Sequence, residues 1–493
     1  MKERILYRPL QKKLTTAAEA ALRIRSGMTV AFGGYTSSGY PKAVADELAR
    51  RKASEPELCF RVISGSSNGP LDGLLAEHEL CERRISLLGH RSMSAAVNAG
   101  KIAYVEEQMN RMPQLLRSGA YGKIDILVVE ALGITEEGRL IPTSSVGLLP
   151  NLMDAAGEII IEINTAQPEA LRGMHDIYRV APPPHRRPIP LERVGQRIGW
   201  DTIELDTSKV SAIVESAAPD IAVAAGKNDA TVQKITDNLF NFLELEVRGR
   251  LGGWLPPIQT GFGNLASSIV NNFRESSFRD LQFFCGGINE SCVELLSSGK
   301  VRAVSCGSIE MTPRVMELFK TEPELIRNTI VLRNGEITNC AEIISRLGII
   351  ALSSGIEVDI FGNVNSSHIS GTKVVNGLGG GANFAENAGL SIVMIASEAK
   401  GGDISAIVPM VSHQDILCHD VDVLITENGV ADLRGKTDAE RAALVISRCA
   451  GSYRAQLQDY LDRAKAHGGH HPMLLQEALS WHQRLRETGS MKL

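Results

Sequence analysis

Residues 28–64 read MTVAFGGYTSSGYPKAVADELARRKASEPELCFRVIS. Met28–Gly33 and Leu58–Ser64 are apolar runs with β-branched residues, a composition typical of buried strands. Between them, Pro41–Arg50 carries its apolar residues at the spacing of an amphipathic helix. A strand, a helix and a second strand in succession are typical of an α/β fold.

The same alternation continues along the chain. Further strands are expected at Ile124–Glu130, Glu158–Ile163, Val210–Glu215, Val301–Cys306, Ile349–Leu352, Val358–Phe361, Ser391–Ala396 and Val421–Thr426. PPPHRRPIP at 182–190 can form neither a helix interior nor a central strand, so it predicts a connecting loop. A chain of 493 residues exceeds what one core usually supports. We therefore predict two open α/β domains, 1–220 and 221–493, with the boundary within 217–231 before a helix at Val232–Val247.

The composition limits the possible partners. A formal net charge of -5 with scattered basic residues argues against nucleic acid. Nothing in the chain approaches the ~18 consecutive apolar residues of a membrane span, so we predict a cytoplasmic protein without a membrane partner. The eight cysteines lack metal-type pairing, and the histidines lie in no ligand pattern. We therefore expect reduced thiols and no metal site.

Glycines gather where backbone amides could face a ligand. Residues 32–34 (FGG) resemble residues 261–263 (GFG), and each set is expected to lie between a strand and a helix, a place that suits an anion or a tight turn without a ligand. Residues 376–409 read NGLGGGANFAENAGLSIVMIASEAKGGDISAIVP. The glycines at 379–381 could stabilise an oxyanion in acyl transfer, and Lys400 could meet a phosphate. Close packing and a solvated lysine explain the same residues without a ligand.

Motifs over nearly the whole chain resemble the acetyl-CoA hydrolase/transferase family, in particular its succinyl-CoA:acetate and propionyl-CoA:succinate CoA-transferase branch. They are GYPK at 39–42, GKID at 122–125, IPTSSVG at 141–147, GMHD at 173–176, EVDI at 357–360, NVN at 363–365, NG at 376–377, AKGG at 399–402, IVPMVSH at 407–413, HDV at 419–421 and ADLRG at 431–435. The resemblance implies class I CoA-transferase domains, a homodimer, and acyl-CoA bound in the cleft between domains with most contacts from the second domain. Coenzyme A would be a substrate and not a tightly bound cofactor.

The resemblance also assigns roles to individual residues. It implies that Asn339 orients the thioester, that the Gly380 amide donates to the oxyanion, and that Glu427 is a second carboxylate of the pocket. The residues that it places at coenzyme A are Gln259, Thr260, Gly261, Phe262, Gly263, Asn376, Gly379, Gly380 and Lys400.

One position departs from the family. Its catalytic glutamate, which carries the acyl group and then coenzyme A, lies in a Tyr-Thr-Glu-Val sequence ahead of a Ser-Gly-Lys helix end. This chain has FCGGINES at 284–291 before SGK at 298–300, and alignment without gaps puts Gly286 at the glutamate position. A register shifted by four would instead supply Glu290 and preserve ordinary CoA transfer. A side-chain carboxylate is indispensable to the covalent route.

Three explanations of the missing glutamate remain open. Cys285 could act as a nucleophile, although successive strand side chains point to opposite faces and a buried, inert cysteine fits the sequence too. Alternatively, space freed at Gly286 admits an external nucleophile, with Glu290, Glu398 or Glu427 moving protons; decarboxylation belongs to this class. The chain could also bind acyl-CoA without turnover. We predict an enzyme that transfers an acyl or CoA group from a small acyl-CoA to an acceptor, not by the usual glutamyl-CoA ping-pong route.

Overall fold

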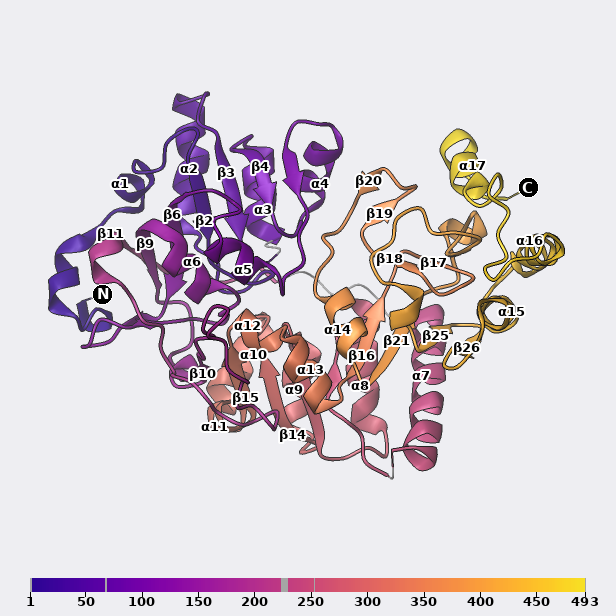
Figure 1. The fold of residues 1–493 in the computed structure, drawn as a ribbon. Coiled ribbons are helices and arrows are strands. Elements are labelled where there is room, and N and C mark those ends of the chain that lie inside the picture. The colour runs from indigo at the N-terminus through magenta and orange to yellow at the C-terminus, as the bar shows by residue number, and fades with distance from the viewer. Residues whose placement is uncertain (1, 67–68, 223–228, 252, 493) are drawn as a thin grey trace. The chain divides into compact units, whose positions relative to one another are not determined.

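The computed structural model describes residues 2–66, 69–222, 229–251 and 253–492 (Figure 1). The chain forms two compact units: unit 1 is Met1–Ala224 with Arg279–Arg346, and unit 2 is Ala225–Phe278 with Leu347–Leu493. This division differs from the predicted domains, 1–220 and 221–493, because 279–346 belongs to unit 1. The reason is backbone pairing: the Val146 amide donates to Gly307 O at 2.9 Å, and the Gly335 amide donates to Gly147 O at 2.7 Å.

Unit 1 contains an eight-stranded sheet whose paired strands are all parallel. The strand order is β1-β11-β9-β6-β2-β3-β4-β5. The strands are β1 (Leu14–Thr15), β2 (Thr29–Phe32), β3 (Phe60–Ser64), β4 (Cys81–Ile85), β5 (Ala103–Val105), β6 (Ile124–Ala131), β9 (Ala156–Asn164) and β11 (Val210–Ser216). From β2 the chain forms β3, β4 and β5 in order toward one edge of the sheet, and it then forms β6 on the other side of β2.

Helices cover this sheet in two groups. Helices α1 to α4 pack successively on one another, while α5 packs on α6, which lies on β6 and β9 (Figure 1). They are α1 (Ala17–Ala21), α2 (Ala43–Ser54), α3 (Gly69–Glu77), α4 (Arg91–Asn98), α5 (Met112–Arg117) and α6 (Leu149–Ala155). Helix α2 begins where it does because the buried Glu162 carboxylate accepts the amides of Lys42, Ala43 and Val44 at 2.8, 3.0 and 3.2 Å. Those amides have no partner inside the helix.

In the later segment of unit 1, four parallel strands that do not belong to the eight-stranded sheet lie in the order β10-β15-β14-β13. They are β10 (His175–Asp176), β13 (Leu281–Cys285), β14 (Val301–Cys306) and β15 (Ile330–Arg333), with a short hairpin of β7 (Gly133–Ile134) and β8 (Leu140–Ile141) elsewhere in the unit. The helices are α9 (Glu290–Leu296), α10 (Pro313–Thr321), α11 (Pro323–Thr329), α12 (Gly335–Thr338) and α13 (Ala341–Leu347). The segment 182–190 contains neither helix nor strand, as its prolines predict.

Unit 2 has the strand order β12-β16-β21-β25-β26, parallel except for the last pair. These strands are β12 (Ile258–Gln259), β16 (Ile350–Ser354), β21 (Leu390–Met394), β25 (Val423–Thr426) and β26 (Gly429–Asp432). Small sheets are formed by β17 (Glu357–Asp359), β18 (Val364–Asn365) and β24 (Ile407–Val408), by β19 (His368–Ile369) and β20 (Lys373–Val374), and by β22 (Glu398–Ala399) and β23 (Ile404–Ser405).

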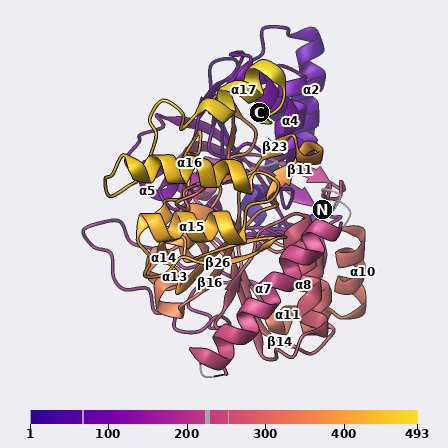
Figure 2. The same ribbon diagram turned by 90° about the vertical axis from the view of Figure 1, so that its right-hand side faces the viewer.

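Four of the helices of unit 2 form two packed pairs. The helices of the unit are α7 (Ala230–Gly249), α8 (Asn264–Glu275), α14 (Gly381–Asn387), α15 (Asp438–Arg448), α16 (Arg454–Ala466) and α17 (Ser480–Thr488). Helix α7 lies beside α8, and α15 lies beside α16 (Figure 2). The predicted α/β class is confirmed. Among the helices of the described residues, none combines the length and the apolar character needed to cross a membrane.

Candidate functional site

The eight-stranded sheet changes its direction of growth between β2 and β6. In open α/β sheets, ligands bind at the carboxyl ends of the strands at such a switch point. The loop after β2 contains Gly33, Gly34 and Tyr35, and helix α2 begins only at Ala43. FGG at 32–34 is therefore followed by a longer loop, and not directly by the helix that the sequence suggested.

Part of this switch point is filled by the protein itself. The buried Lys42 ammonium lies 2.6 Å from a Glu130 oxygen and 2.6 Å from an Asp220 oxygen. Its nitrogen also lies 4.3 Å from the centre of the Tyr40 ring. Gln167 donates to both carboxylates, at 3.1 Å to Glu130 and 2.9 Å to Asp220. Because each of these groups has partners inside the network, we assign the network a structural role.

Beside this network, loops that follow the strands of the later segment lie against one another. The Gly307 amide donates to Gly286 O at 2.9 Å, and the Ile288 amide donates to Ser308 O at 3.0 Å. A Cβ atom at position 307 would lie 3.7 Å from Thr338 Oγ1, so the loop after β15 reaches the same place. We call residues 286–288, 307–308, 334–339 and 143–147 the strand-end cluster.

Tyr35 occupies the side-chain position of residue 286. A Cβ atom in ideal geometry at Gly286 would lie 2.4 Å from Tyr35 Oη and 3.5 Å from Tyr35 Cζ. The ring also packs on Gly147, where a Cβ atom would lie 3.1 Å from Tyr35 Cδ2. The hydroxyl bonds Met109 Sδ at 3.5 Å, and the residue is 5% exposed. The space at Gly286, which the sequence suggested was open, is therefore filled by a phenol.

The phenol is neutral. Burial, followed by the neighbouring Cys285 and Cys306 thiols, raises the pKa of Tyr35 above its ordinary value. A neutral phenol keeps one O–H donor and two acceptor lone pairs. It can hold a polar partner, but it cannot serve as the anionic nucleophile that a carboxylate would provide.

Cys285, the other candidate nucleophile, lies at the end of β13 and is completely buried. Its strand partner in register is Cys306, on β14. Burial raises the pKa of the thiols of Cys292 and Cys306 well above the ordinary value. Such an environment suits inert, reduced thiols. A nucleophilic role for Cys285 stays a prediction.

The two remaining candidates of unit 1 are Glu290 and Asn339. Glu290 is the first residue of α9, and its carboxylate accepts a hydrogen bond from the Thr312 hydroxyl. It is thus four residues beyond Gly286 and on a helix, not at the strand end. Asn339 is 2% exposed, and its Oδ1 accepts from Thr338 Oγ1 at 2.9 Å. Asn339 therefore belongs to the cluster, and its role at the thioester stays a prediction.

In unit 2, Gln259–Gly263 joins β12 to α8, so this glycine turn does precede a helix. Gly263 has φ 98°, a conformation that favours glycine, and it caps α8. Gln259 is 8% exposed, and among the described residues its Oε1 has no hydrogen-bond partner. A buried amide oxygen without a partner is uncommon and marks a place where a ligand group could donate. Phe262 is 41% exposed.

A second set of predicted coenzyme A residues precedes α14. Gly379 has φ 68°, and Gly380 caps the helix. The Asn376 amide donates to Ser367 O at 3.3 Å, and its Nδ2 donates to Ser366 O at 3.4 Å. Both serines donate to the Asp415 carboxylate. This carboxylate thereby fixes the loop that holds Asn376.

Lys400 and Glu427 have contrasting environments. Lys400 is exposed and has φ 50°, an unusual value for a residue with a side chain. The Glu427 carboxylate accepts from the Ser397 amide at 2.9 Å and from the Ser397 hydroxyl. Glu398 accepts from the Ser452 amide. The two glutamates therefore have structural bonds, whereas Lys400 has its ammonium at the surface.

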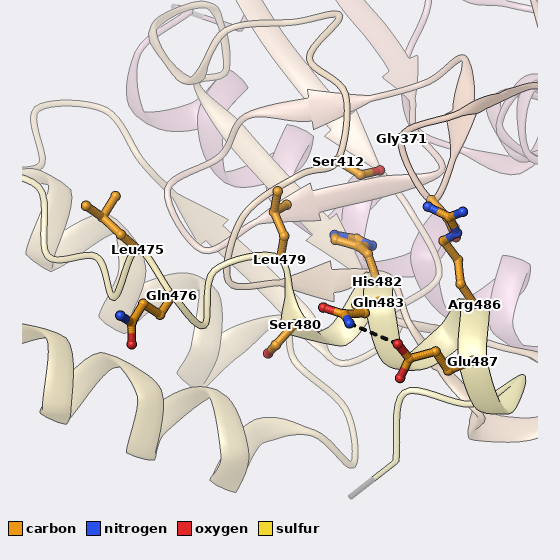
Figure 3. Close-up of a pocket in the computed structure, with 11 residues that line it drawn as sticks. Gly371, Ser412, Leu475, Gln476, Leu479, Ser480, His482, Gln483, Arg486 and Glu487 are labelled. Carbon is orange, nitrogen blue, oxygen red and sulfur yellow. Dashed lines mark hydrogen bonds between the residues drawn. The ribbon is translucent and has the colours of Figure 1, made fainter.

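Two cavities in the described part of the chain are lined by none of the predicted site residues. One, of about 620 Å³, lies beside α17 in unit 2 (Figure 3). Its lining includes His482, whose Nε2 bonds Met410 O at 3.0 Å, and Gln483, which donates to Glu487 at 2.9 Å. The second of these two, of about 500 Å³, lies in unit 1 and is lined by Arg139 and the exposed Trp200.

Family models match both ends of the chain. The acetyl-CoA hydrolase/transferase N-terminal domain matches residues 1–215, and the C-terminal domain of the same name matches residues 317–461. The succinyl-CoA:acetate CoA-transferase of Clostridium kluyveri is 41% identical over 99% of this chain and 92% of its own length. The chain belongs to the acetyl-CoA hydrolase/transferase family. The resemblance predicted from the motifs is confirmed, and so is the enzyme class.

Other family members carry a different name. The acetyl-CoA hydrolase of Schizosaccharomyces pombe is 37% identical over 98% of this chain and 96% of its own length. A solved structure of RipA from Yersinia pestis matches with a TM-score of 0.72 at 20% identity, covering 93% of this chain and 98% of the other. The 4-hydroxybutyrate CoA-transferase of Porphyromonas gingivalis matches with a TM-score of 0.64 at 18% identity, covering 92% and 99%. These structures share the fold.

Within this family member, Tyr35 is the site residue that sequence reasoning missed. The signal was an aromatic residue directly after the Gly33-Gly34 turn at the end of a strand. Its significance depends on a contact with Gly286, a residue 251 positions away. Family motifs at 39–42 and 141–147 marked the loops on both sides, but motifs do not reveal which side chain enters a gap.

Proposed function

We propose that this family member transfers the acyl group of a small acyl-CoA directly to an external nucleophile, with no covalent intermediate on the protein. One observation carries the proposal. The gapless alignment puts the family glutamate at position 286, which has no side chain in this protein. The neutral Tyr35 hydroxyl lies 2.4 Å from the place that a Cβ atom of residue 286 would take. The family's covalent route needs a carboxylate at this place.

The proposed reaction has two balanced steps. The nucleophile's lone pair forms a bond to the thioester carbon, and the carbonyl electrons move to oxygen to give a tetrahedral oxyanion. The oxyanion then collapses, the C–S bond breaks, and coenzyme A leaves as a thiolate that gains the proton lost by the nucleophile. Water as nucleophile gives a carboxylic acid and free coenzyme A, the reaction named for the acetyl-CoA hydrolases among the relatives.

We assign the roles within this reaction as the family resemblance implies. The Gly380 amide and Asn339 serve the thioester oxygen, because a donor aimed at a developing oxyanion stabilises it strongly. Residues 259–263, Asn376, Gly379 and Lys400 bind coenzyme A. The buried Gln259 Oε1, which has no partner among the described residues, supports a polar ligand there. Cytoplasmic location and a homodimer stay part of the proposal, and light scattering of the purified protein tests the dimer.

Isotope labelling tests the route. The protein is incubated with acetyl-, propionyl- and succinyl-CoA in H₂¹⁸O, with deuterated acetate or succinate present, and both the CoA esters and the intact protein are followed by mass spectrometry. We expect loss of thioester, ¹⁸O in the released acid, no deuterium in CoA esters and no change in protein mass. Rapid entry of deuterium would instead show ordinary CoA transfer, with Glu290 as the candidate carboxylate. An acylated peptide containing Cys285 would identify a cysteine nucleophile.

A further inference from the structure

Resting on the proposed function, a further assignment concerns the attacking group. We infer that the phenol oxygen of Tyr35 holds the external nucleophile by accepting a hydrogen bond, and that this nucleophile therefore carries an O–H or N–H proton. Water, an alcohol or an amine fits this description. A carboxylate acceptor, the substrate class of a CoA-transferase, does not.

The hydrogen bonds of the phenol lead to this assignment. Tyr35 is 5% exposed, and among the described residues its hydroxyl has one partner, Met109 Sδ at 3.5 Å. A thioether can only accept, so the single phenol proton is directed to Met109 and both oxygen lone pairs remain available. Buried polar atoms normally have a partner in the protein or in a bound molecule. The available lone pairs need a donor, and a protic nucleophile is a donor.

The surroundings of the phenol also favour a neutral guest. The ring packs on Gly147, and the neighbouring groups are the Met109 thioether and the thiols of Cys285 and Cys306. The thioether carries no charge, and burial raises the pKa of the Cys306 thiol well above its ordinary value, which keeps that thiol neutral. An anionic acceptor would lose hydration there without gaining a counter-ion from these groups, which is costly. A neutral O–H or N–H nucleophile avoids that cost.

The position of the Tyr35 oxygen relates its hydrogen bond with the nucleophile to the reaction. This oxygen lies 2.4 Å from the Cβ position of residue 286, inside the volume of any longer side chain. In the family alignment that volume belongs to the attacking carboxylate. A nucleophile bonded to the Tyr35 oxygen therefore approaches from the side of the missing glutamate, with its lone pair free for the thioester carbon. Tyr35 keeps its own proton throughout, and the nucleophile's proton passes to the departing thiolate.

Removal of the hydroxyl tests the assignment. For Tyr35→Phe we expect kcat for hydrolysis of acetyl- and propionyl-CoA to fall about 100-fold, because the nucleophile loses its orientation, with KM for acyl-CoA unchanged. The matched control is Tyr121→Phe, which removes another buried hydroxyl that has no hydrogen-bond partner in the described part of the chain. We expect wild-type kcat for this control. Wild-type kcat in Tyr35→Phe would overturn the inference while leaving the proposed function intact.

A second comparison does not depend on wild-type turnover. Gly286→Glu restores a carboxylate, but Tyr35 Oη blocks its first carbon; in the double variant with Tyr35→Phe, the nearest remaining atom is Cζ at 3.5 Å. We expect exchange of deuterated acetate into CoA esters by the double variant and not by Gly286→Glu alone. Equal exchange by both would show that Tyr35 does not hold this place and would overturn the inference. A wild-type protein that consumes no acyl-CoA with water or hydroxylamine, or that exchanges labelled acetate itself, would overturn the proposed function as well.

Discussion

The contact between Tyr35 and Gly286 makes a quantitative prediction about stability, independent of any activity. In Gly286→Ala, the new Cβ would lie 2.4 Å from Tyr35 Oη, so the buried ring or the loop must shift. Overpacking of this kind costs about 1–3 kcal/mol in the free energy of unfolding. In the Tyr35→Phe background the nearest atom is Cζ at 3.5 Å, an ordinary contact. There, Gly286→Ala should be neutral or stabilise by about 0.4–1 kcal/mol, because alanine restricts the unfolded chain.

The two backgrounds together form a double-mutant cycle. We expect Gly286→Ala and Tyr35→Phe to couple by roughly 2 kcal/mol, measured as shifts of the urea unfolding midpoint followed by circular dichroism. The matched control is Gly261→Ala, where an added Cβ has no atom within 4 Å. Its effect should be the same in both backgrounds, within about 0.5 kcal/mol. A coupling below that value between positions 35 and 286 would refute the steric reasoning, whatever the enzyme proves to catalyse.

Three further predictions concern buried charges and coenzyme A. Burial lowers the pKa of His175 to about 4, so the folded protein disfavours the protonated ring. Above pH ~6.5 the ring is neutral in the folded and unfolded chain alike. Below that pH the unfolded chain takes up a proton first, and the free energy of unfolding falls by about 2 kcal/mol at pH 5. Urea unfolding at pH 5 and 7.5 should show a smaller pH difference in His175→Gln, and an unchanged difference would contradict this assignment. Arg84 pairs with Asp72 at 2.8 Å with both side chains buried, so Arg84→Met should cost about 3–5 kcal/mol in urea unfolding, and a loss below about 1 kcal/mol would contradict it. Lys400→Met should raise KM for acyl-CoA roughly 10-fold at low salt and less at high salt, whereas the exposed Lys373→Met should not; equal effects would remove Lys400 from the coenzyme A site.

Much of the fold follows from local sequence pattern. Val301–Cys306 forms a strand with the predicted bounds, and the helix predicted at Val232–Val247 is observed as Ala230–Gly249. Prediction from apolar runs works for this strand because its last four residues, Ala303 to Cys306, are all buried, as in a parallel strand covered on both faces. Val358–Phe361 was less well predicted: the strand is Glu357–Asp359, because the Asp359 carboxylate accepts the amides of Phe361 and Gly362 in a turn. A side chain that bonds its own backbone ends the strand, and apolar character alone does not reveal this.

The assignment of 279–346 to unit 1 has a different origin. Its strands are as apolar as those that follow in unit 2, so periodicity cannot say to which unit the segment belongs. What decides is the set of loop contacts at the strand ends, such as Ile309 N to Ser144 O at 2.9 Å. These contacts are between backbone groups and leave little trace in side-chain pattern. Pairing of this kind, between backbone segments far apart in the chain, is the part of a fold that is hardest to predict from a single sequence.

Gly286 shows that the same limit of sequence-based prediction applies at the candidate site. From the sequence, a glycine in place of a glutamate predicts an empty space, since glycine has no side chain. In the folded chain the space belongs to whichever neighbour can reach it, and Tyr35 reaches it from the loop after β2, through a ring packed on Gly147. If the gapless alignment holds, the loss of a carboxylate at position 286 and the phenol at position 35 are two parts of one structural change. If that is correct, neither substitution can be reversed alone: Gly286→Glu meets the hydroxyl, and Tyr35→Phe leaves no group to hold a nucleophile. Only the double variant has both the carboxylate and the room for it. Exchange of labelled acetate into CoA esters by this variant would show that residues 35 and 286 account for the difference between the chemistry of this protein and CoA transfer.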